Sequence, residues 1–437
     1  MDVALGVRRE DRDRWEARTP LVPPDVAMLT RRNGTRVVVQ PSTVRAFSDD
    51  EYGEAGAEVC EDLSPCRVVM AVKEIPEAAI ERGVTYAFFS HTMKGQAHNM
   101  GMLRRLVEQR CQLLDYELIT DANGRRLVHF GRYAGLAGAI DSLWALGQRL
   151  EWEGVTPNPF RGLKQTYHYG SLRRACAAVR QVSRRIRHEG LPGEIDPLVI
   201  GLTGYGNVSR GAQEIIDCLG AVEIRPKDLK MLGQNGRPCQ HRVLKVVFHE
   251  TDMVSPCRPG ADFDLHEYWS YPDRYLGTFH RWLPFLSVLL NCVYWDERYH
   301  RLVTVDAVRE LYAEEDKPKL KVIGDISCDI GGSIEFNIKD THIDNPIYVF
   351  DCQSETVIDG IGGKGPVVLA VGNLPCELPI EASLAFSSAL SPMVSHLLEE
   401  DFSRQFSGLR LPSSMKKALI LQNGSFTDAF KYMEAYI

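Results

Sequence analysis

The sequence predicts an α/β protein that folds into two domains, each built around a parallel β-sheet. Its 437 residues exceed what one ordinary hydrophobic core holds, so two domains are expected. Short β-branched runs alternate with stretches of helical periodicity, and these runs are too apolar for a sheet with one solvated face. Near the middle of the chain, an apolar run leads into a glycine turn and then a helical stretch, which is typical of a wound α/β sheet.

The first elements lie in residues 1–147. Residues 37–40, 68–73 and 86–90 are predicted strands, and residues 24–32 and 98–109 are predicted helices. A long helix rich in alanine and glycine is expected at about 134–150, where small side chains suit close packing or a connector between domains. The stretch 153–164 holds two prolines and two glycines and is expected to be a crossing loop.

A second block of alternating elements follows. Apolar residues recur at helical spacing from Leu172 to Ile186, and six arginines occupy the other faces of that helix. Strands are expected at 198–202, 221–224, 243–248 and 321–326, with a helix at 210–219. The tail is expected to hold a strand at 367–371 and helices at 383–400 and 415–421. We therefore expect one domain at 1–147 plus 335–437 and another at 148–334.

Composition and charge exclude several classes of protein. The net charge of −7 argues against nucleic acid as the main partner, so the arginines of the 172–186 helix are interpreted as a solvated face. No apolar run approaches the roughly 20 residues that span a bilayer, and the N-terminus is charged, so a cytoplasmic protein without a secretory signal is expected. The 11 cysteines include no C-x-x-C pair, which predicts reduced packing thiols and no metal site.

The glycine turn predicts a dinucleotide site. The apolar run 197–202 is followed by Gly204 and Gly206 and then by a helical stretch. Gly204 permits the tight turn, Gly206 lets the backbone approach a pyrophosphate, and the N–H groups of the helix N-terminus meet its negative charge. Ser209 stands where the fingerprint has a third glycine, and its small side chain still allows close helix–strand packing. The alternative is a tight glycine turn without a ligand.

The choice of dinucleotide stays open in this stretch. Glu223 stands at the end of the next predicted strand, where an acidic residue contacts the ribose. Arg225 and Lys227 follow it and could favour a 2′-phosphate, whereas Glu223 would favour a free ribose. The motif therefore predicts NAD or NADP.

Three residues of the first domain are candidates for chemistry. Lys73 and His91 each follow a predicted strand, and ligands of open α/β sheets bind outside the carboxyl ends of strands. A partly desolvated lysine has a lowered pKa, and histidine transfers protons near neutral pH. The guanidinium of Arg18, in a loop before a predicted helix, could hold a carboxylate bidentately. Taken singly, each has an ordinary alternative as a surface charge or a capping residue.

The chain resembles the saccharopine dehydrogenase family, most closely the lysine–2-oxoglutarate reductase half of aminoadipic semialdehyde synthase. The wider group includes alanine dehydrogenase and the nucleotide-binding part of transhydrogenase. The resemblance runs from about residue 6 to 425. The stretches that carry it are 8–10, 16–23, 71–74, 86–92, 114–117, 130–138, 203–213, 291–295, 325–336 and 359–381.

The resemblance implies roles for individual residues. Lys73 and His91 would be the acid/base pair. Arg18, Glu117 and Arg132 would bind the substrate. The turn residues and their neighbours would bind the cofactor, with Asp325 beside the nicotinamide: Gly204, Tyr205, Gly206, Asn207, Val208, Ser209, Glu223, Arg225 and Asp325. The family fold has two Rossmann-like domains flanking a cofactor cleft, with the tail returning to the first domain.

The implied function is an NAD(P)-dependent oxidoreductase acting on a C–N bond. Lysine would condense with 2-oxoglutarate to an imine, and hydride transfer to the imine carbon would give saccharopine, or the reverse. The resemblance favours NADPH slightly over NADH. The chain ends where the bifunctional enzyme continues, so we expect a free-standing reductase-type unit.

Three alternatives stay open at this point. The chain could act on another lysine-derived or opine-type secondary amine, could be a non-catalytic nucleotide-binding scaffold, or could bind nucleic acid through its arginine-rich helix. The expected partners are a small amino acid and an oxo acid, with no membrane; a homodimer is the commonest arrangement among soluble oligomers.

Overall fold

The computed structural model describes residues 4–232, 242–314 and 318–437. They form two compact units, which are described separately below. The first unit is Met1–Phe130 together with Pro379–Ile437, and the second unit is Gly131–Leu378. Each contains an eight-stranded, mostly parallel sheet, which confirms the predicted α/β class.

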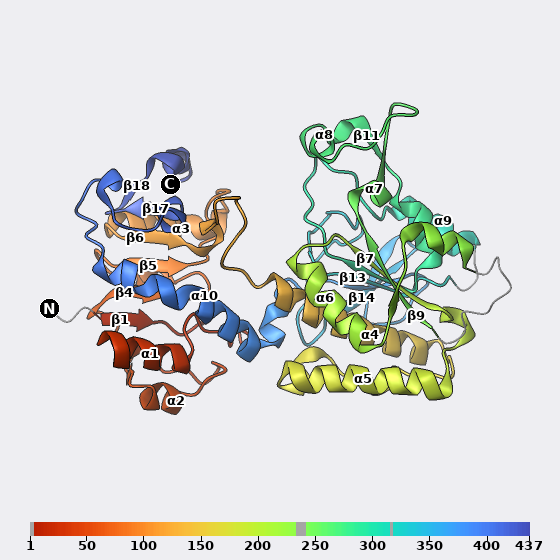
Figure 1. Cartoon of the computed structure of the whole chain (residues 1–437), viewed down its shortest axis with the longest axis horizontal. Helices are drawn as coiled ribbons and strands as arrows, with labels where there is room; N and C mark the ends of the chain where they lie inside the picture. The colour runs from red at the N-terminus through yellow and green to blue at the C-terminus, as the bar shows by residue number, and fades with distance from the viewer. Residues whose placement is uncertain (1–3, 233–241, 315–317) are drawn as a thin grey trace. The chain divides into compact units, whose positions relative to one another are not determined.

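In the sheet of the first unit, strands β1 to β6 are all parallel to one another. Its order is β18-β17-β6-β5-β4-β1-β2-β3, and the two strands from the tail of the chain are antiparallel. In Figure 1 these two blue strands extend the red and orange sheet. The strands are β1 (Ala4–Val7), β2 (Arg36–Val39), β3 (Glu58–Val59), β4 (Cys66–Met70), β5 (Thr85–Phe88), β6 (Gln112–Asp115), β17 (Leu419–Gln422) and β18 (Ser425–Phe426).

Helices from both ends of the chain cover this sheet. Helix α10 packs beside α1, and its Ser383 and Ser387 hydroxyls accept hydrogen bonds from the backbone N–H groups of Thr19 and Val22, both at 3.0 Å. The tail is therefore an integral part of the first unit, as the family resemblance implies. The helices of this unit are α1 (Pro23–Asn33), α2 (Asp49–Glu54), α3 (Ala97–Glu108), α10 (Pro379–Glu399) and α11 (Ser413–Lys417).

The helix predicted at 415–421 is wrong in its second half. Helix α11 ends at Lys417, and the chain continues as strand β17, in which Leu419 pairs with Leu114 and Leu421 with Leu113 of β6. All four leucines are buried, so the apolar run serves the sheet and not a helix face.

The sheet of the second unit has the order β15-β14-β16-β13-β12-β7-β9-β8, with β14 and β15 antiparallel. Strand β8 follows β7 in the sequence, yet β9 lies between them in the sheet. The strands are β7 (Leu198–Thr203), β8 (Val222–Glu223), β9 (Val243–Phe248), β12 (Val288–Asn291), β13 (Val322–Asp325), β14 (Ile347–Asp351), β15 (Thr356–Asp359) and β16 (Val367–Leu369). A separate hairpin pairs β10 (Val254–Pro256) with β11 (Tyr275–Gly277).

Helices α4 and α6 of the second unit touch backbone to backbone. A Cβ atom on Gly135 of α4 would lie 1.9 Å from the Val208 carbonyl oxygen, and one on Gly211 of α6 would lie 2.0 Å from that of Arg132. Only glycine fits at these positions, which explains the small residues of α4. The helices are α4 (Gly131–Trp152), α5 (Leu172–Glu189), α6 (Asn207–Cys218), α7 (Glu250–Met253), α8 (Leu265–Ser270) and α9 (Val305–Glu314).

The borders of the two units differ from those expected at 147/148 and 334/335. Helix α4 belongs to the second unit because it packs along α6, and residues 347–369 belong there because β14, β15 and β16 extend its sheet.

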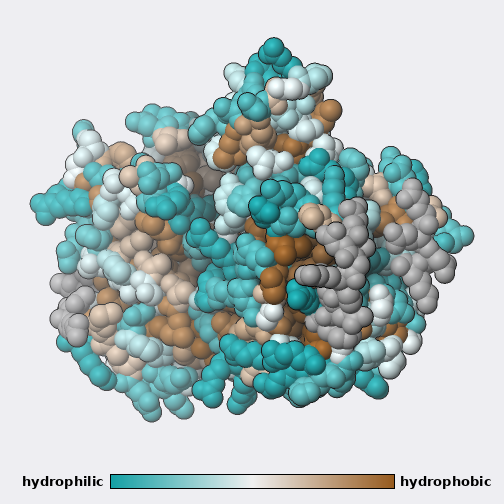
Figure 2. All heavy atoms as spheres, turned by 45° about the vertical axis from the view of Figure 1, so that its right-hand side comes forward, coloured by the Kyte–Doolittle hydropathy of each residue, from teal (hydrophilic) through white to brown (hydrophobic). Residues whose placement is uncertain are grey.

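The surface carries both hydrophilic and hydrophobic residues. Helix α5 buries one face, including Val179, Val182 and Ile186, as its periodicity predicts. On the side seen in Figure 2, hydrophobic residues gather in patches between hydrophilic ones. Among the described residues, no helix is long and apolar enough to cross a membrane, and the cysteines are free thiols.

Candidate functional site

The carboxyl edge of the first sheet gathers the candidate reactive residues of the first unit. Because β1, β4, β5 and β6 are parallel, the segments that follow them meet at one edge. Lys73 lies just beyond β4 and His91 just beyond β5, while Arg18 belongs to the segment that follows β1. The structure thus brings Arg18, Lys73 and His91 to the same edge.

Arg18 forms a buried ion pair with Glu16. Its Nε lies 2.7 Å from Glu16 Oε1 and its Nη2 lies 2.5 Å from Glu16 Oε2, with the side chains 1% and 0% exposed. The guanidinium also lies over the Phe130 ring, 4.2 Å from its centroid. A buried guanidinium needs such a counter-charge. The ion pair and the ring contact fix the guanidinium at this edge of the sheet.

Lys73 is half-buried, and its backbone is held by Glu10. The Glu10 carboxylate accepts hydrogen bonds from Val72 N at 2.6 Å and from Lys73 N at 3.0 Å. Burial and the positive charge of Arg18 lower the pKa of Lys73. Burial and the nearby Glu16 raise the pKa of Glu10 to about 8. A lysine with a lowered pKa is a usable acid and base near neutral pH.

His91 is held by Glu74, the residue after Lys73. Its Nδ1 lies 2.5 Å from Glu74 Oε1, and its backbone has a positive φ of 47°. Burial opposes ionisation of Glu74, but the hydrogen bond from His91, a backbone hydrogen bond and the charge of Arg12 together outweigh it, and the pKa of Glu74 falls to about 2. Because Nδ1 is bonded to this carboxylate, Nε2 is the ring nitrogen left to exchange a proton with a ligand.

Two buried polar side chains keep the loop of His91 in place. Asn99 Nδ2 donates to the carbonyl oxygens of Ser90 and His91, both at 3.2 Å. Asp115, at the end of β6, accepts from the Ser90 hydroxyl at 2.5 Å and from its backbone N–H at 3.2 Å. These hydrogen bonds stabilise the left-handed backbone conformation of His91, which non-glycine residues rarely adopt.

A pocket of about 450 Å³ opens beside Glu74. Its charged lining includes the carboxylates of Asp11, Glu74 and Glu77 and the guanidinium of Arg12, together with His98. Arg12 Nη1 lies 3.7 Å from Glu74 Oε2. Asp11 is ion-paired with Arg8, so Glu77 is the lining carboxylate for which the described residues show no ion pair, and it could meet a ligand that carries an amine.

The other two candidate substrate residues are less directly placed. Glu117 follows β6 at the same edge, but its Oε1 lies 2.5 Å from Arg126 Nη2. Arg132 belongs to the second unit, where its guanidinium makes two hydrogen bonds to Glu214, at 2.7 and 2.5 Å.

In the second unit, the glycine turn has the geometry that the sequence predicts. Gly204 has a positive φ of 78°, and a Cβ there would lie 3.0 Å from Val293. Gly206 is the N-cap of α6, and a Cβ there would meet no protein atom within 4 Å. The space above Gly206 is therefore open to a ligand, beside the N–H groups of Asn207, Val208 and the rest of the first helical turn.

Ser209 and Tyr205, which flank Gly206 in this turn, differ in exposure. Ser209 is fully buried and accepts a hydrogen bond from Gln213 Nε2 at 3.1 Å, so it takes the packing role of the third glycine. Tyr205 is 40% exposed and stacks on His249, with 4.6 Å between ring centroids. The glycines, the helix N-terminus and the open space fit a pyrophosphate.

Asp325 is the centre of a buried polar network at the carboxyl ends of β7, β12 and β13. It accepts hydrogen bonds from Asn291 Nδ2 at 2.8 Å and Asn337 Nδ2 at 2.7 Å. Thr203 donates to Asn291 at 2.9 Å, and Asn291 also reaches Ser333 at 2.7 Å. Burial raises the pKa of Asp325. The network holds three strand ends together next to the glycine turn.

Two of the three candidates for ribose or 2′-phosphate recognition, Glu223 and Arg225, are engaged elsewhere. Glu223 Oε2 lies 3.1 Å from Lys245 Nζ, which also contacts Asp217 at 2.8 Å. Arg225 Nε lies 3.0 Å from Asp228 Oδ2.

Several site residues were missed from the sequence alone. Glu10, Asn99 and Asp115 hold the reactive segments of the first unit, and Asn291 and Asn337 hold those of the second. Asp115 and Asn291 could have been found, because each is a polar residue that ends an apolar strand. Within the described parts of the chain, no group of three or more metal-ligating side chains comes together.

Comparison with known proteins identifies relatives of this chain. The family model of the alanine dehydrogenase/PNT N-terminal domain matches residues 6–137. The alpha-aminoadipic semialdehyde synthase of Arabidopsis thaliana is 38% identical over 98% of this chain and 41% of its own. A saccharopine dehydrogenase (NAD+, L-lysine-forming) of Yarrowia lipolytica is 25% identical over 91% of this chain and 93% of its own.

The fold is that of a solved L-alanine dehydrogenase, with a TM-score of 0.64 at 16% identity and 99% of both chains covered. The chain spans about half the length of the alpha-aminoadipic semialdehyde synthases that it matches. The resemblance to the saccharopine dehydrogenase family is thus confirmed over nearly the whole chain, which is a homologue of saccharopine dehydrogenases and of alpha-aminoadipic semialdehyde synthases.

Proposed function

We propose that the chain is an NAD(P)-dependent oxidoreductase that joins lysine and 2-oxoglutarate into saccharopine, or runs the reverse reaction. The observation that carries the proposal is that Lys73, with its lowered pKa, lies close to the charges of Arg18 and of Glu74, the carboxylate that holds His91. The homologues support it, because their names describe saccharopine dehydrogenases that form L-lysine and semialdehyde synthases.

The residues of the first unit would bind the substrates and move their protons. Arg18 would hold a substrate carboxylate. Attack of the amine on the oxo carbon forms a carbinolamine, and Lys73 would protonate its hydroxyl so that water leaves and an imine remains. His91, held through Nδ1 by Glu74, would exchange the proton of the substrate nitrogen through Nε2.

The second unit would hold the dinucleotide, which when bound supplies or accepts the hydride. Gly204, Gly206 and the first turn of α6 would bind the pyrophosphate, with Ser209 packed below. Asp325 and Asn291 would keep the strand ends beside it in register.

The Glu77 carboxylate in the pocket beside Glu74 supports lysine as the amine substrate. It favours an amino acid with a second amine over one with an apolar side chain. A different secondary amine of the opine type is the runner-up, since the proton-transfer residues would serve both. A cytoplasmic location and a homodimer stay predictions.

The test is dinucleotide oxidation, followed by absorbance, with lysine and 2-oxoglutarate and with mass spectrometry of the product. Saccharopine is the expected product. Lys73→Met should lower turnover about 100-fold or more, the usual effect of losing a positioned acid/base, and should leave dinucleotide binding unchanged. Wild-type turnover in this variant would remove Lys73 from the mechanism. Dinucleotide binding without turnover on any amine and oxo acid pair would favour the scaffold alternative.

A further inference from the structure

A 3₁₀ helix near the C-terminus, η10 (Asp428–Tyr436), packs on the loop that follows β5 in the same unit. The Tyr432 hydroxyl donates a hydrogen bond to the Met93 carbonyl oxygen at 3.2 Å, across 339 residues of chain. The Tyr436 ring covers Gly95, since a Cβ on this glycine would lie 3.0 to 3.1 Å from three of the ring atoms. Two tyrosines from the far end of the sequence therefore contact this loop.

The loop, residues 89–96, carries His91 and has a conformation that its surroundings must stabilise. His91 has a φ of 47° and Gly95 has a φ of 65°, both in the left-handed region. The Gly95 N–H closes a turn by donating to the Thr92 carbonyl oxygen at 3.0 Å. A left-handed histidine persists only where the surrounding structure holds it. The direction of the His91 ring therefore depends on contacts at both ends of the loop.

The two ends of the loop are held by different parts of the unit. At the first end, the side chains of Glu74 and Asn99 hold His91. At the second end, residues 93–95 receive one side-chain hydrogen bond from outside the loop among the described residues, and Tyr432 is its donor. The C-terminal tyrosines are therefore to the second end what Glu74 and Asn99 are to the first.

Other residues anchor η10 in the core of the unit. Phe430 and Met433 are its buried residues, whereas Tyr432 and Tyr436 are 50% and 40% exposed. The two tyrosine rings meet edge to face, with 6.1 Å between their centroids. Burial of Phe430 and Met433 thus accounts for the position of η10, and the tyrosines that it carries are placed against the loop.

We propose that Tyr432 and Tyr436 are positioning residues for proton transfer by His91, because they hold the loop in the conformation that directs Nε2 towards the substrate. The inference rests on the proposed function, in which His91 exchanges the proton of the substrate nitrogen. Each tyrosine acts through the loop and not through the substrate. Without them, Glu74 would still hold Nδ1, but the backbone that carries the ring would move more freely. A displacement of about 1 Å at a reacting group lowers turnover by up to about 100-fold.

Steady-state kinetics test the proposal. Tyr436→Ala should lower kcat about 10-fold or more and leave the KM for the dinucleotide unchanged, because the proposed dinucleotide residues belong to the second unit. Tyr436→Phe should keep the wild-type kcat, because the ring and not the hydroxyl covers Gly95. Tyr432→Phe loses the hydrogen bond to Met93 and should lower kcat about 3- to 10-fold, the usual effect of one hydrogen bond. Phe406→Ala, at a ring 39% exposed on another 3₁₀ turn of this unit, is the control and should keep the wild-type kcat.

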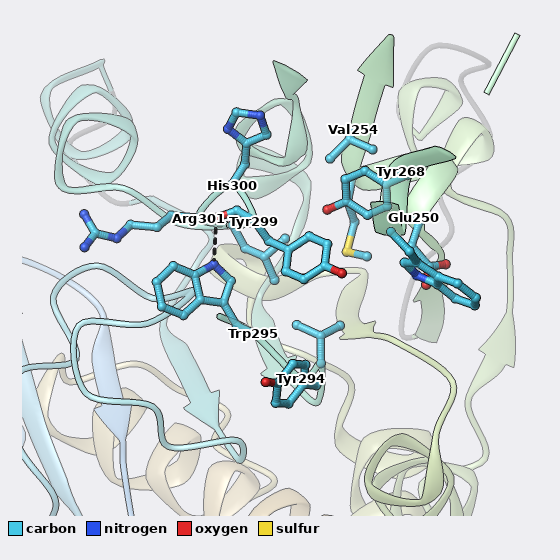
Figure 3. Close-up of a pocket in the computed structure, with 12 residues that line it drawn as sticks. Glu250, Val254, Tyr268, Tyr294, Trp295, Tyr299, His300 and Arg301 are labelled. Carbon is cyan, nitrogen blue, oxygen red and sulfur yellow. Dashed lines mark hydrogen bonds between the residues drawn. The ribbon is translucent and has the colours of Figure 1, made fainter. Parts of the chain in front are cut away.

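Hydrogen–deuterium exchange of the loop supplies a measurement that needs no turnover. The Gly95 amide, which donates to Thr92, should exchange about 10-fold faster in Tyr436→Ala and at the wild-type rate in Tyr436→Phe. Tyr294→Ala is the control, because it removes an exposed tyrosine that lines a pocket of the second unit (Figure 3). It should leave the exchange of the loop unchanged.

Wild-type kcat and wild-type loop exchange in both Tyr436→Ala and Tyr432→Phe would overturn the inference. So would equal losses of kcat in Tyr436→Phe and Tyr436→Ala, or a lowered kcat with unchanged loop exchange. If Tyr436→Ala does not fold, Tyr432→Phe, which keeps its ring, decides by the same two measurements. If the wild-type protein does not convert lysine and 2-oxoglutarate, the proposed reaction is rejected, and faster exchange in Tyr436→Ala still upholds the role of the tyrosines in holding the loop. Unchanged exchange in that case would reject both.

Discussion

The same substitution, glycine to alanine, should act mainly on stability at Gly211 of α6 and mainly on dinucleotide binding at Gly206, the N-cap of that helix. At Gly211 the new Cβ would lie 2.0 Å from the Arg132 carbonyl oxygen, whereas ordinary contacts begin at 3.4 Å. Helices α4 and α6 would have to separate by about 1.4 Å, and rigid backbone on both sides leaves no side chain to yield. Overpacking of this kind costs about 3 kcal/mol, the upper end of its usual range.

At Gly206 the Cβ would meet no protein atom within 4 Å. Gly206→Ala should therefore lower the free energy of unfolding by about 1 kcal/mol or less, the cost of alanine as a helix N-cap. Its methyl group would, however, occupy the space through which a pyrophosphate approaches the backbone. We expect NADH affinity to fall about 100-fold in Gly206→Ala with the fold intact.

Urea unfolding and calorimetric titration of both variants measure the two effects separately. Gly193→Ala is the control, since its Cβ also meets nothing within 4 Å and the position lies outside the turn. It should match the wild-type protein in both measurements. A Gly206→Ala variant that binds NADH normally, or a Gly211→Ala variant as stable as the wild type, would refute the reasoning from backbone contacts.

Two further predictions follow from buried charge. Glu16→Gln should lower the free energy of unfolding of the first unit by about 3 kcal/mol, because it leaves the Arg18 guanidinium buried without its counter-charge. In the same urea experiment Glu61→Gln, which breaks an exposed ion pair, should lower the free energy of unfolding by less than about 1 kcal/mol. Equal losses in the two variants would contradict the argument. Burial and the neighbouring Asp141 raise the pKa of Glu377 well above 4.5, so its stabilising effect is complete below that pH and is lost as the pH rises through the folded-state pKa. Glu10, whose pKa is raised to about 8, also destabilises both proteins over this range. Urea unfolding from about pH 5 to about pH 9 should therefore show a steeper loss in the wild type than in Glu377→Gln, and equal slopes in the two would contradict the argument.

The local pattern of the sequence predicted much of the fold. Strand β9 and helices α1, α3 and α5 lie close to the ranges predicted from hydrophobic periodicity, because the apolar residues of each segment all belong to a single regular element. Strand β12 was not predicted, because a short apolar run reads equally as a buried strand or a helix segment. The run that forms β17 was predicted as helix, because its partner β6 lies about 300 residues earlier in the chain and leaves no trace in the local pattern.

The candidate site was predictable where one residue follows one strand. Lys73 and His91 were predicted on that basis. Their partners were not, because the contact of Glu10 with Lys73 depends on which strands are neighbours in the sheet. The same limit applies to Glu223, since the order of strands along the chain is not their order in the sheet.

The return of the tail to the first unit has a consequence for synthesis on the ribosome. Strand β6 emerges early, but β17, which covers its edge, is made only after the whole second unit. At about 5–20 residues per second, those roughly 250 residues take on the order of 10–50 s to translate. During that time the nascent first unit exposes a free strand edge and lacks α10. Such an edge can pair with other chains, so we expect the emerging protein to depend on chaperones until its last residues are made.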